Sequence, residues 1–113
     1  MTKDDDGASH PLDLKHLAEQ TFGSAELEAE VLRLFLKQAR DCMSKLRTSP
    51  DAATAHLLLG SARGIGATTV ANTAAALEAR LLRGGAVNAD LSELDRAVKA
   101  ATAFIEAHLG TRA

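Results

Sequence analysis

The sequence lacks tryptophan and tyrosine, and its 113 residues include only three phenylalanines, two prolines and one cysteine. Cys42 alone cannot form a disulfide within the chain, and no Cys/His spacing suits zinc, so this composition fits a reducing cytoplasm. No apolar run approaches the ~18 residues that span a bilayer, and the first seven residues are too acidic for a signal peptide. We therefore expect a cytoplasmic protein that does not bind membranes.

The charge is nearly balanced, with 13 Lys+Arg against 15 Asp+Glu and a formal net charge of −2. Nucleic-acid binding needs a concentrated basic face, so we expect no nucleic-acid partner. The length suits one domain with a single core and is too short for a kinase catalytic domain or for most stand-alone enzymes. We expect a monomer with one domain, over residues 11–110, after a disordered acidic tail at residues 1–10.

Alanine and leucine dominate the composition, with 23 and 17 residues. They are the strongest helix formers, whereas the aromatic and β-branched residues that favour strands are scarce. The chain is therefore predicted to be all-α. A short N-terminal helix should end near Phe22 and Gly23, and four longer helices should follow it. Their expected spans are 24–47, 49–64, 68–84 and 90–110.

Local signals mark the expected helix ends. Ser24 can cap one helix, and Ser49 followed by Pro50 is a start signal for the next. Asp90 opens a capping box at the start of the last helix, and glycines are expected to end the last three helices. Short connections between long amphipathic helices imply antiparallel neighbours. We therefore expect an antiparallel up-down-up-down four-helix bundle with a short extra N-terminal helix.

The most unusual stretch surrounds His56. If Leu58 and its apolar neighbours face the core, then His56, Leu59, Gly60 and Arg63 share the outer face of the helix. A helical side chain leans toward the N-terminus and covers the preceding turn, so Gly60 leaves the imidazole of His56 open. A neutral imidazole has one ring nitrogen free as a nucleophile, which can accept a phosphoryl group and pass it on.

Two other interpretations of this stretch compete. His56 can be an ordinary surface histidine, with Gly60 as a point of close helix packing. Separately, the run from Gly60 to Gly66 resembles the G-x-x-x-G-x-G turn of short-chain dehydrogenases. That turn follows a buried strand, whereas the residues before Gly60 are typical of a helix, and the catalytic tyrosine of that family has no counterpart here. We reject the nucleotide-binding interpretation.

The stretch contains the pattern His56-x-Leu58-x-Gly60-Ser61-Ala62-x-x-x-Gly66-Ala67. It resembles the H-x-L-K-G-x-A-x-x-x-G-A signature of histidine-containing phosphotransfer (HPt) domains of bacterial two-component phosphorelays. The segment 22–38 resembles the second helix of that family and the pair at 77–78 its fourth, so the resemblance covers residues 11–109.

By this resemblance, His56 is the phosphoacceptor and Gly60 gives access to it, with Arg63, Lys37 and Gln38 beside the site. The resemblance implies a relay of a phosphoryl group between aspartates of response-regulator receiver domains, with a hybrid histidine kinase as a further candidate partner. We expect no cofactor or metal in this chain, and no kinase or ATPase activity of its own. Mg²⁺ and most catalytic groups are expected in the receiver.

The chain departs from the signature at Leu59, where the family usually has lysine. Loss of an exposed cation weakens the attraction of an acidic partner by ~1 kcal/mol or less, and Arg63 can substitute for it in part. With Leu57, Leu59 would form an exposed apolar strip that can dock a partner helix. An alternative function follows from this strip, a non-phosphorylated docking or adaptor module that binds a receiver or kinase domain through the Leu57/Leu59 surface.

Overall fold

The structure is a computed structural model and describes residues 11–112. The predicted tail at residues 1–10 lies outside the described residues. Within the described range the chain forms five helices and no strand, which confirms the all-α prediction. The helices are α2 (Leu14–Gln20), α3 (Ala25–Thr48), α4 (Ala52–Ile65), α5 (Thr68–Arg83) and α6 (Asn88–Arg112).

The caps of α3 and α4 show which start signals the chain uses. The Ser24 side chain accepts a hydrogen bond from the backbone N–H of Leu27 at 3.1 Å, as predicted. The predicted start at Ser49 is wrong, because Asp51 caps α4 instead. One carboxylate oxygen of Asp51 accepts from the Thr54 N–H at 2.7 Å and the other from the Thr54 hydroxyl at 2.8 Å. These bonds hold the pKa of the Asp51 carboxyl below its usual 3.8, and the paired contact favours aspartate over serine as the cap.

Gly66 ends α4 and connects it to the start of α2. It has φ +78°, a left-handed conformation that glycine adopts without steric cost. The backbone N–H of Asp13 donates to the Gly66 carbonyl at 2.8 Å, and a Cβ on Gly66 would lie 3.0 Å from the Asp13 carbonyl oxygen. The predicted break near this glycine is therefore confirmed, and the break also fixes the position of α2.

The last helix differs from its prediction at both ends. It begins at Asn88 rather than Asp90 and continues to Arg112, beyond Gly110. The carboxylate of Asp90 accepts a hydrogen bond from the Arg80 guanidinium at 3.0 Å. Asp90 therefore links α6 to α5.

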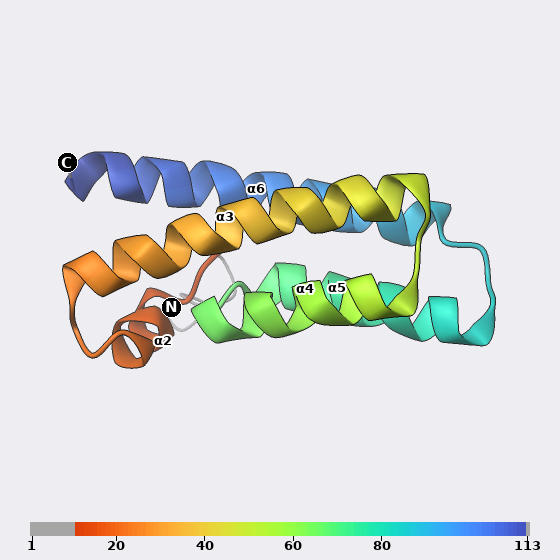
Figure 1. Cartoon of the computed structure of the whole chain (residues 1–113), viewed down its shortest axis with the longest axis horizontal. Coiled ribbons are helices and arrows are strands. Elements are labelled where there is room, and N and C mark those ends of the chain that lie inside the picture. Colours follow the sequence, from red (N-terminus) through yellow and green to blue (C-terminus); the bar gives the residue numbers. More distant parts are fainter. Residues whose placement is uncertain (1–10, 113) are drawn as a thin grey trace, which may run out of the picture.

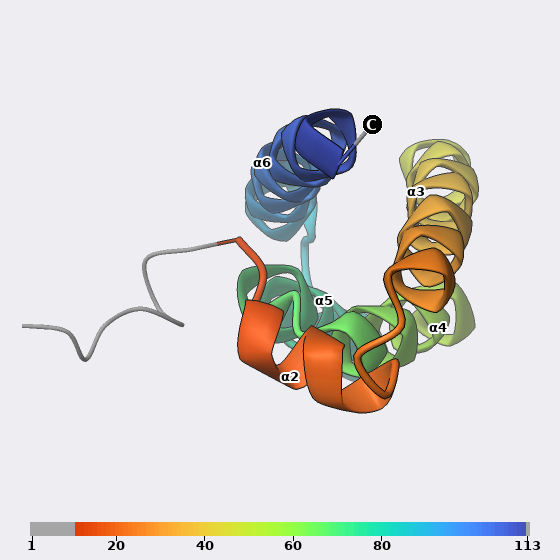
Figure 2. The same ribbon diagram turned by 90° about the vertical axis from the view of Figure 1, so that its left-hand side faces the viewer.

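The four long helices lie lengthwise beside one another, and the chain turns back between each helix and the next (Figure 1). Contacts join α3 to α4, α4 to α5, α5 to α6, and α6 back to α3. The short helix α2 packs against α4 at one end of the molecule, as the end view shows (Figure 2). Helix α4 is therefore covered by three neighbours, α2, α3 and α5.

Apolar side chains from all five helices form the core. Burial of each large side chain contributes about 1.5–3 kcal/mol relative to exposure. Cys42 is buried, and burial raises the pKa of its thiol. No helix over residues 11–112 has the length and apolar character needed to cross a membrane. The largest fully buried side chains include Leu17, Leu32, Met43, Leu46, Leu58, Leu77, Leu94 and Ile105.

Candidate functional site

His56 lies on α4 with 70% of its side chain exposed, and one of its ring nitrogens is held by a neighbouring helix. Its Nδ1 lies 3.0 Å from Oε2 of Glu78, which projects from α5 and is only 22% exposed. With the Nδ1 proton donated to this carboxylate, Nε2 carries the lone pair of the neutral ring. The structure gives Nε2 no hydrogen-bond partner among residues 11–112. The arrangement fixes the ring and leaves a nucleophilic nitrogen open to solvent.

Gly60 lies one turn after His56 on α4, and no neighbouring helix requires a glycine there. A Cβ added to Gly60 would meet no atom within 4 Å. The competing interpretation of Gly60 as a point of close helix packing is therefore wrong. A side chain at this position would lean back over the turn that carries His56. Open space around the imidazole is the local consequence of the glycine.

The structure corrects the prediction for Leu59. Leu59 is only 5% exposed and belongs to the core, whereas Leu57 is 52% exposed. The prediction assumed a single buried stripe on α4. Because α4 packs against three helices, its buried arc is wide enough to include both Leu58 and Leu59. Of the two residues in the predicted Leu57/Leu59 docking strip, only Leu57 is exposed. The predicted strip is therefore wrong.

Gln38 and Lys37 face the same side of the molecule as Leu57. The Ser61 hydroxyl on α4 donates to the amide oxygen of Gln38 on α3. Lys37 forms an exposed ion pair with Asp41 at 3.1 Å, and exposed pairs of this kind contribute little to stability. A partner can therefore bind the Lys37 ammonium with little loss of stability from breaking this ion pair.

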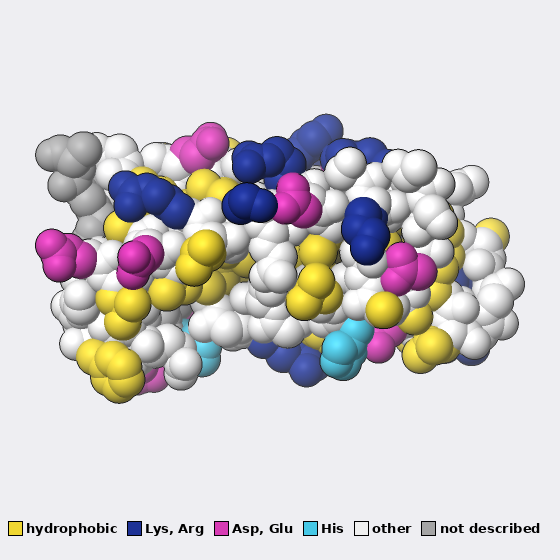
Figure 3. All heavy atoms as spheres, in the orientation of Figure 1, with side chains coloured by type: hydrophobic (Ala, Val, Ile, Leu, Met, Phe, Trp, Pro, Cys, Tyr) yellow, Lys and Arg dark blue, Asp and Glu magenta, His cyan; other side chains and the backbone are white. Residues whose placement is uncertain are grey.

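Two adjoining hollows run between α3 and α4, and together we call them the α3/α4 groove. One has a volume of about 430 Å³ and the other about 320 Å³. Figure 3 shows this face, with hydrophobic side chains spread along it and lysine and arginine side chains gathered over α3. Both hollows share Leu34 and Gln38. The residues that line the groove also include Lys37, Asp41, Lys45 and Leu57 in the first hollow, and Thr21, Gly60, Ser61, Gly64 and Ile65 in the second.

Arg63 does not line this groove. It is exposed and borders a separate hollow of about 220 Å³ that Asp13 and His16 also line. Arg63 is seven residues after His56, about 10 Å further along the helix axis. Its predicted place beside the phosphoacceptor stays a prediction.

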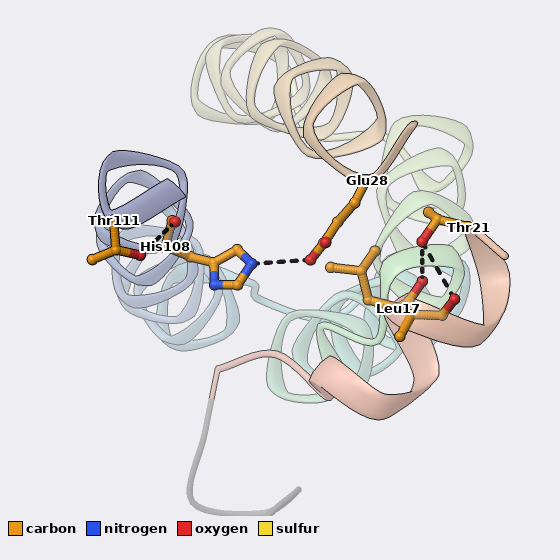
Figure 4. Close-up of polar contacts among 6 residues, drawn as sticks. Leu17, Thr21, Glu28, His108 and Thr111 are labelled. Carbon is orange, nitrogen blue, oxygen red and sulfur yellow. Dashed lines mark hydrogen bonds and ion pairs between the residues drawn. The ribbon is translucent and has the colours of Figure 1, made fainter. Parts of the chain in front are cut away.

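The histidine near the C-terminal end has a structural partner. His108 on α6 points toward Glu28 on α3 (Figure 4), with Nε2 2.9 Å from Oε2 of the glutamate. Both side chains are largely buried. At the far end of the same two helices, Arg47 and Lys99 hydrogen-bond to Asp95 and hold the pKa of its carboxyl below the usual range. These contacts connect α3 to α6 at both ends, so His108 serves the fold.

Glu78 is the site residue that the sequence did not assign. It lies 22 positions after His56, and only the packing of α5 on α4 brings the two side chains together. The sequence offered one signal for Glu78, because the pair at 77–78 resembles part of the fourth HPt helix. Among residues 11–112, no group of three or more His, Cys, Asp and Glu side chains is placed to hold a metal ion.

An exposed histidine, fixed through Nδ1 and open at Nε2 on an all-helical scaffold, defines a histidine-presenting helical domain. The family model for the Hpt domain matches residues 30–109, more than half of the chain. The chain belongs to the Hpt domain family. Members of this family interact with receiver and kinase domains. No curated protein and no solved structure showed a significant match to the chain.

Proposed function

We propose that this protein relays a phosphoryl group between aspartates of response-regulator receiver domains, through His56, in a two-component phosphorelay. The observation that carries the proposal is the state of the imidazole, with Nδ1 held by Glu78 at 3.0 Å and Nε2 open above the turn of Gly60. Membership of the Hpt family supports histidine phosphotransfer as the class of function.

The proposed reaction uses the two ring nitrogens differently. Nε2 attacks the phosphorus of an aspartyl phosphate on one receiver, so the N–P bond forms while the P–O bond breaks and the aspartate carboxylate leaves. The proton stays on Nδ1, and the positively charged phosphorylated ring lies beside the Glu78 carboxylate. The aspartate of a second receiver then attacks the phosphorus, the N–P bond breaks, and the neutral imidazole returns. We place Mg²⁺ and most catalytic groups in the receiver.

The proposal extends to the form of the protein. We propose the antiparallel up-down-up-down four-helix bundle, supported by the ring of contacts among α3, α4, α5 and α6 and by the short connections between them. We also propose a monomer in a bacterial cytoplasm, with receiver domains and a hybrid histidine kinase as partners. The alternative docking module relied on a Leu57/Leu59 strip, and the burial of Leu59 removes that basis.

The direct test is phosphoryl transfer from a panel of purified, phosphorylated receiver domains in the presence of Mg²⁺. The expected result is label on the wild-type chain that is labile in acid and stable in base, as an N–P bond requires. Binding to one or more receivers without label from any of them would overturn the proposal in favour of a docking module.

Replacing Glu78 by alanine is expected to slow transfer about tenfold at saturating receiver. Carboxylates that orient metal-bound histidines contribute about 10–100-fold, and the low end of that range suits His56 because it is largely exposed. The affinity for the receiver should not change. The measurement is the single-turnover rate of labelling.

Glu78→Gln is the matched variant, because its amide oxygen can still accept from Nδ1 and should recover part of the rate. If both variants transfer as fast as wild type, Glu78 has no positioning role.

A further inference from the structure

Phe22 has an unusual combination of conformation and exposure. It lies in the turn between α2 and α3 with φ +55°, in the left-handed region, which is sterically unfavourable for a residue with a bulky side chain. Its side chain is 88% exposed, the most exposed of the large apolar residues in the described chain. The phenyl ring thus gains nothing from burial while the backbone carries strain. The backbone bonds of the turn account for the conformation of the main chain, and the N–H of Phe22 donates to the Glu19 carbonyl at 3.3 Å. They do not account for an aromatic side chain placed in solvent at a strained position, which points to a role outside the fold.

The turn holds Phe22 in this position. The backbone N–H of Gly23 donates to the Ala18 carbonyl at 3.0 Å, and that of Ser24 donates to the Thr21 carbonyl at 2.9 Å. Thr21 is itself buried, and its hydroxyl donates to the Leu17 carbonyl at 2.9 Å (Figure 4). Because the residues on both sides are fixed, the outward direction of the Phe22 ring is built into the turn.

The α3/α4 groove passes Leu57 and Gly60, which adjoin His56 on α4, and reaches this turn. Ile65 lines the groove together with Thr21, the neighbour of Phe22. His56 and Ile65 are nine residues apart on α4, about 14 Å along the helix axis. A standard protein interface covers about 800 Å² on each partner, a patch about 30 Å across. One partner can therefore cover both His56 and the α2–α3 turn.

The groove also indicates the chemistry of that partner. Leu34 and Leu57, 64% and 52% exposed, lie along it, and Lys37 and Lys45 line it on the α3 side. Asp41 also lines this hollow and pairs with Lys37 at 3.1 Å, so the two lysines bring one unit of positive charge more than the aspartate removes. Apolar side chains beside this net positive charge are complementary to an apolar surface that carries carboxylates. A receiver domain that carries an acidic phosphorylation site has the required sign of charge.

We propose that Phe22 is an anchor for the receiver domain, inserting its ring into an apolar pocket on the domain that presents its aspartate to His56. This inference rests on the proposed function. Phe22 lies ahead of residues 30–109, the stretch that the family model matches.

The test compares Phe22→Asn with Leu82→Asn. Asparagine tolerates the left-handed conformation, so Phe22→Asn should fold at least as stably as wild type. Leu82 is also exposed, at 71%, and lies near the end of α5, at the end of the molecule away from the α2–α3 turn (Figure 1). For the receiver that labels the chain fastest, Phe22→Asn should raise KM and Kd about tenfold, as loss of an interface anchor does, and leave the rate at saturation unchanged. Leu82→Asn should change neither.

Equal KM and Kd for Phe22→Asn and wild type would overturn the anchor. Loss of a dimer on sedimentation of Phe22→Asn would also overturn it, since the ring would then serve a second copy of this chain. Absence of label on wild type would count against the proposed function instead. In that case the Kd for a bound receiver still decides whether Phe22 is an anchor.

Discussion

His56→Gln is expected to lose all detectable phosphoryl label while its affinity for the receiver stays within about twofold of wild type. Glutamine has no nucleophilic nitrogen, because its amide lone pair is delocalised into the carbonyl, so the reaction loses its nucleophile. Its amide N–H can still donate to Glu78, which lies 3.0 Å from Nδ1 in the wild type. Since His56 is 70% exposed, the substitution should leave the core intact. Autoradiography after transfer and a binding titration with the same receiver measure the two quantities.

The same substitution at His16 is the matched control. His16 lies on α2, and its backbone N–H, rather than its ring, makes the contact with the Asp13 cap. His16→Gln should be labelled as fast as wild type. Persisting label on His56→Gln would place the phosphoacceptor at another histidine and contradict the assignment.

The placement of Gly60 beside His56 is predictable from sequence because it depends on helix geometry alone, whereas the choice of His56 as the candidate phosphoacceptor came from the family resemblance. His56 and Gly60 are four residues apart on one helix, and that spacing places the glycine over the turn of the histidine. The burial of Leu59 was not predictable in the same way. It depends on how many neighbours cover α4, and the apolar pattern of α4 by itself does not reveal that α2, α3 and α5 all pack on it.

Glu78 and Phe22 show a second limit of sequence analysis. The contact between Glu78 and His56 joins residues on two helices. It depends on the register of α5 against α4, and the residue spacing within each helix does not reveal that register. Phe22 looks like an apolar helix-end residue in the sequence. Only the backbone conformation of the turn shows that its ring points away from the core.

Gly60→Leu is expected to slow phosphoryl transfer about 100-fold without loss of stability. The added side chain would lean over His56 and hold the phosphorus of the receiver away from Nε2, and a displacement of about 1 Å at a reacting centre is enough for an effect of this size. The fold has room for the side chain, since a Cβ at Gly60 meets nothing within 4 Å. Leucine is a better helix former than glycine, so the free energy of unfolding should rise by up to about 1 kcal/mol.

Gly110→Leu separates the two effects. A Cβ at Gly110 also meets nothing within 4 Å, and the residue lies on α6 rather than on the helix that presents the histidine. It should keep the wild-type transfer rate and should not be destabilised. The pair of variants is measured by thermal unfolding and by single-turnover labelling. If Gly60→Leu is more stable and still transfers at the wild-type rate, the glycine does not control access to His56. If it is slow while Gly110→Leu is not, the open turn of α4 is what exposes Nε2 to the receiver.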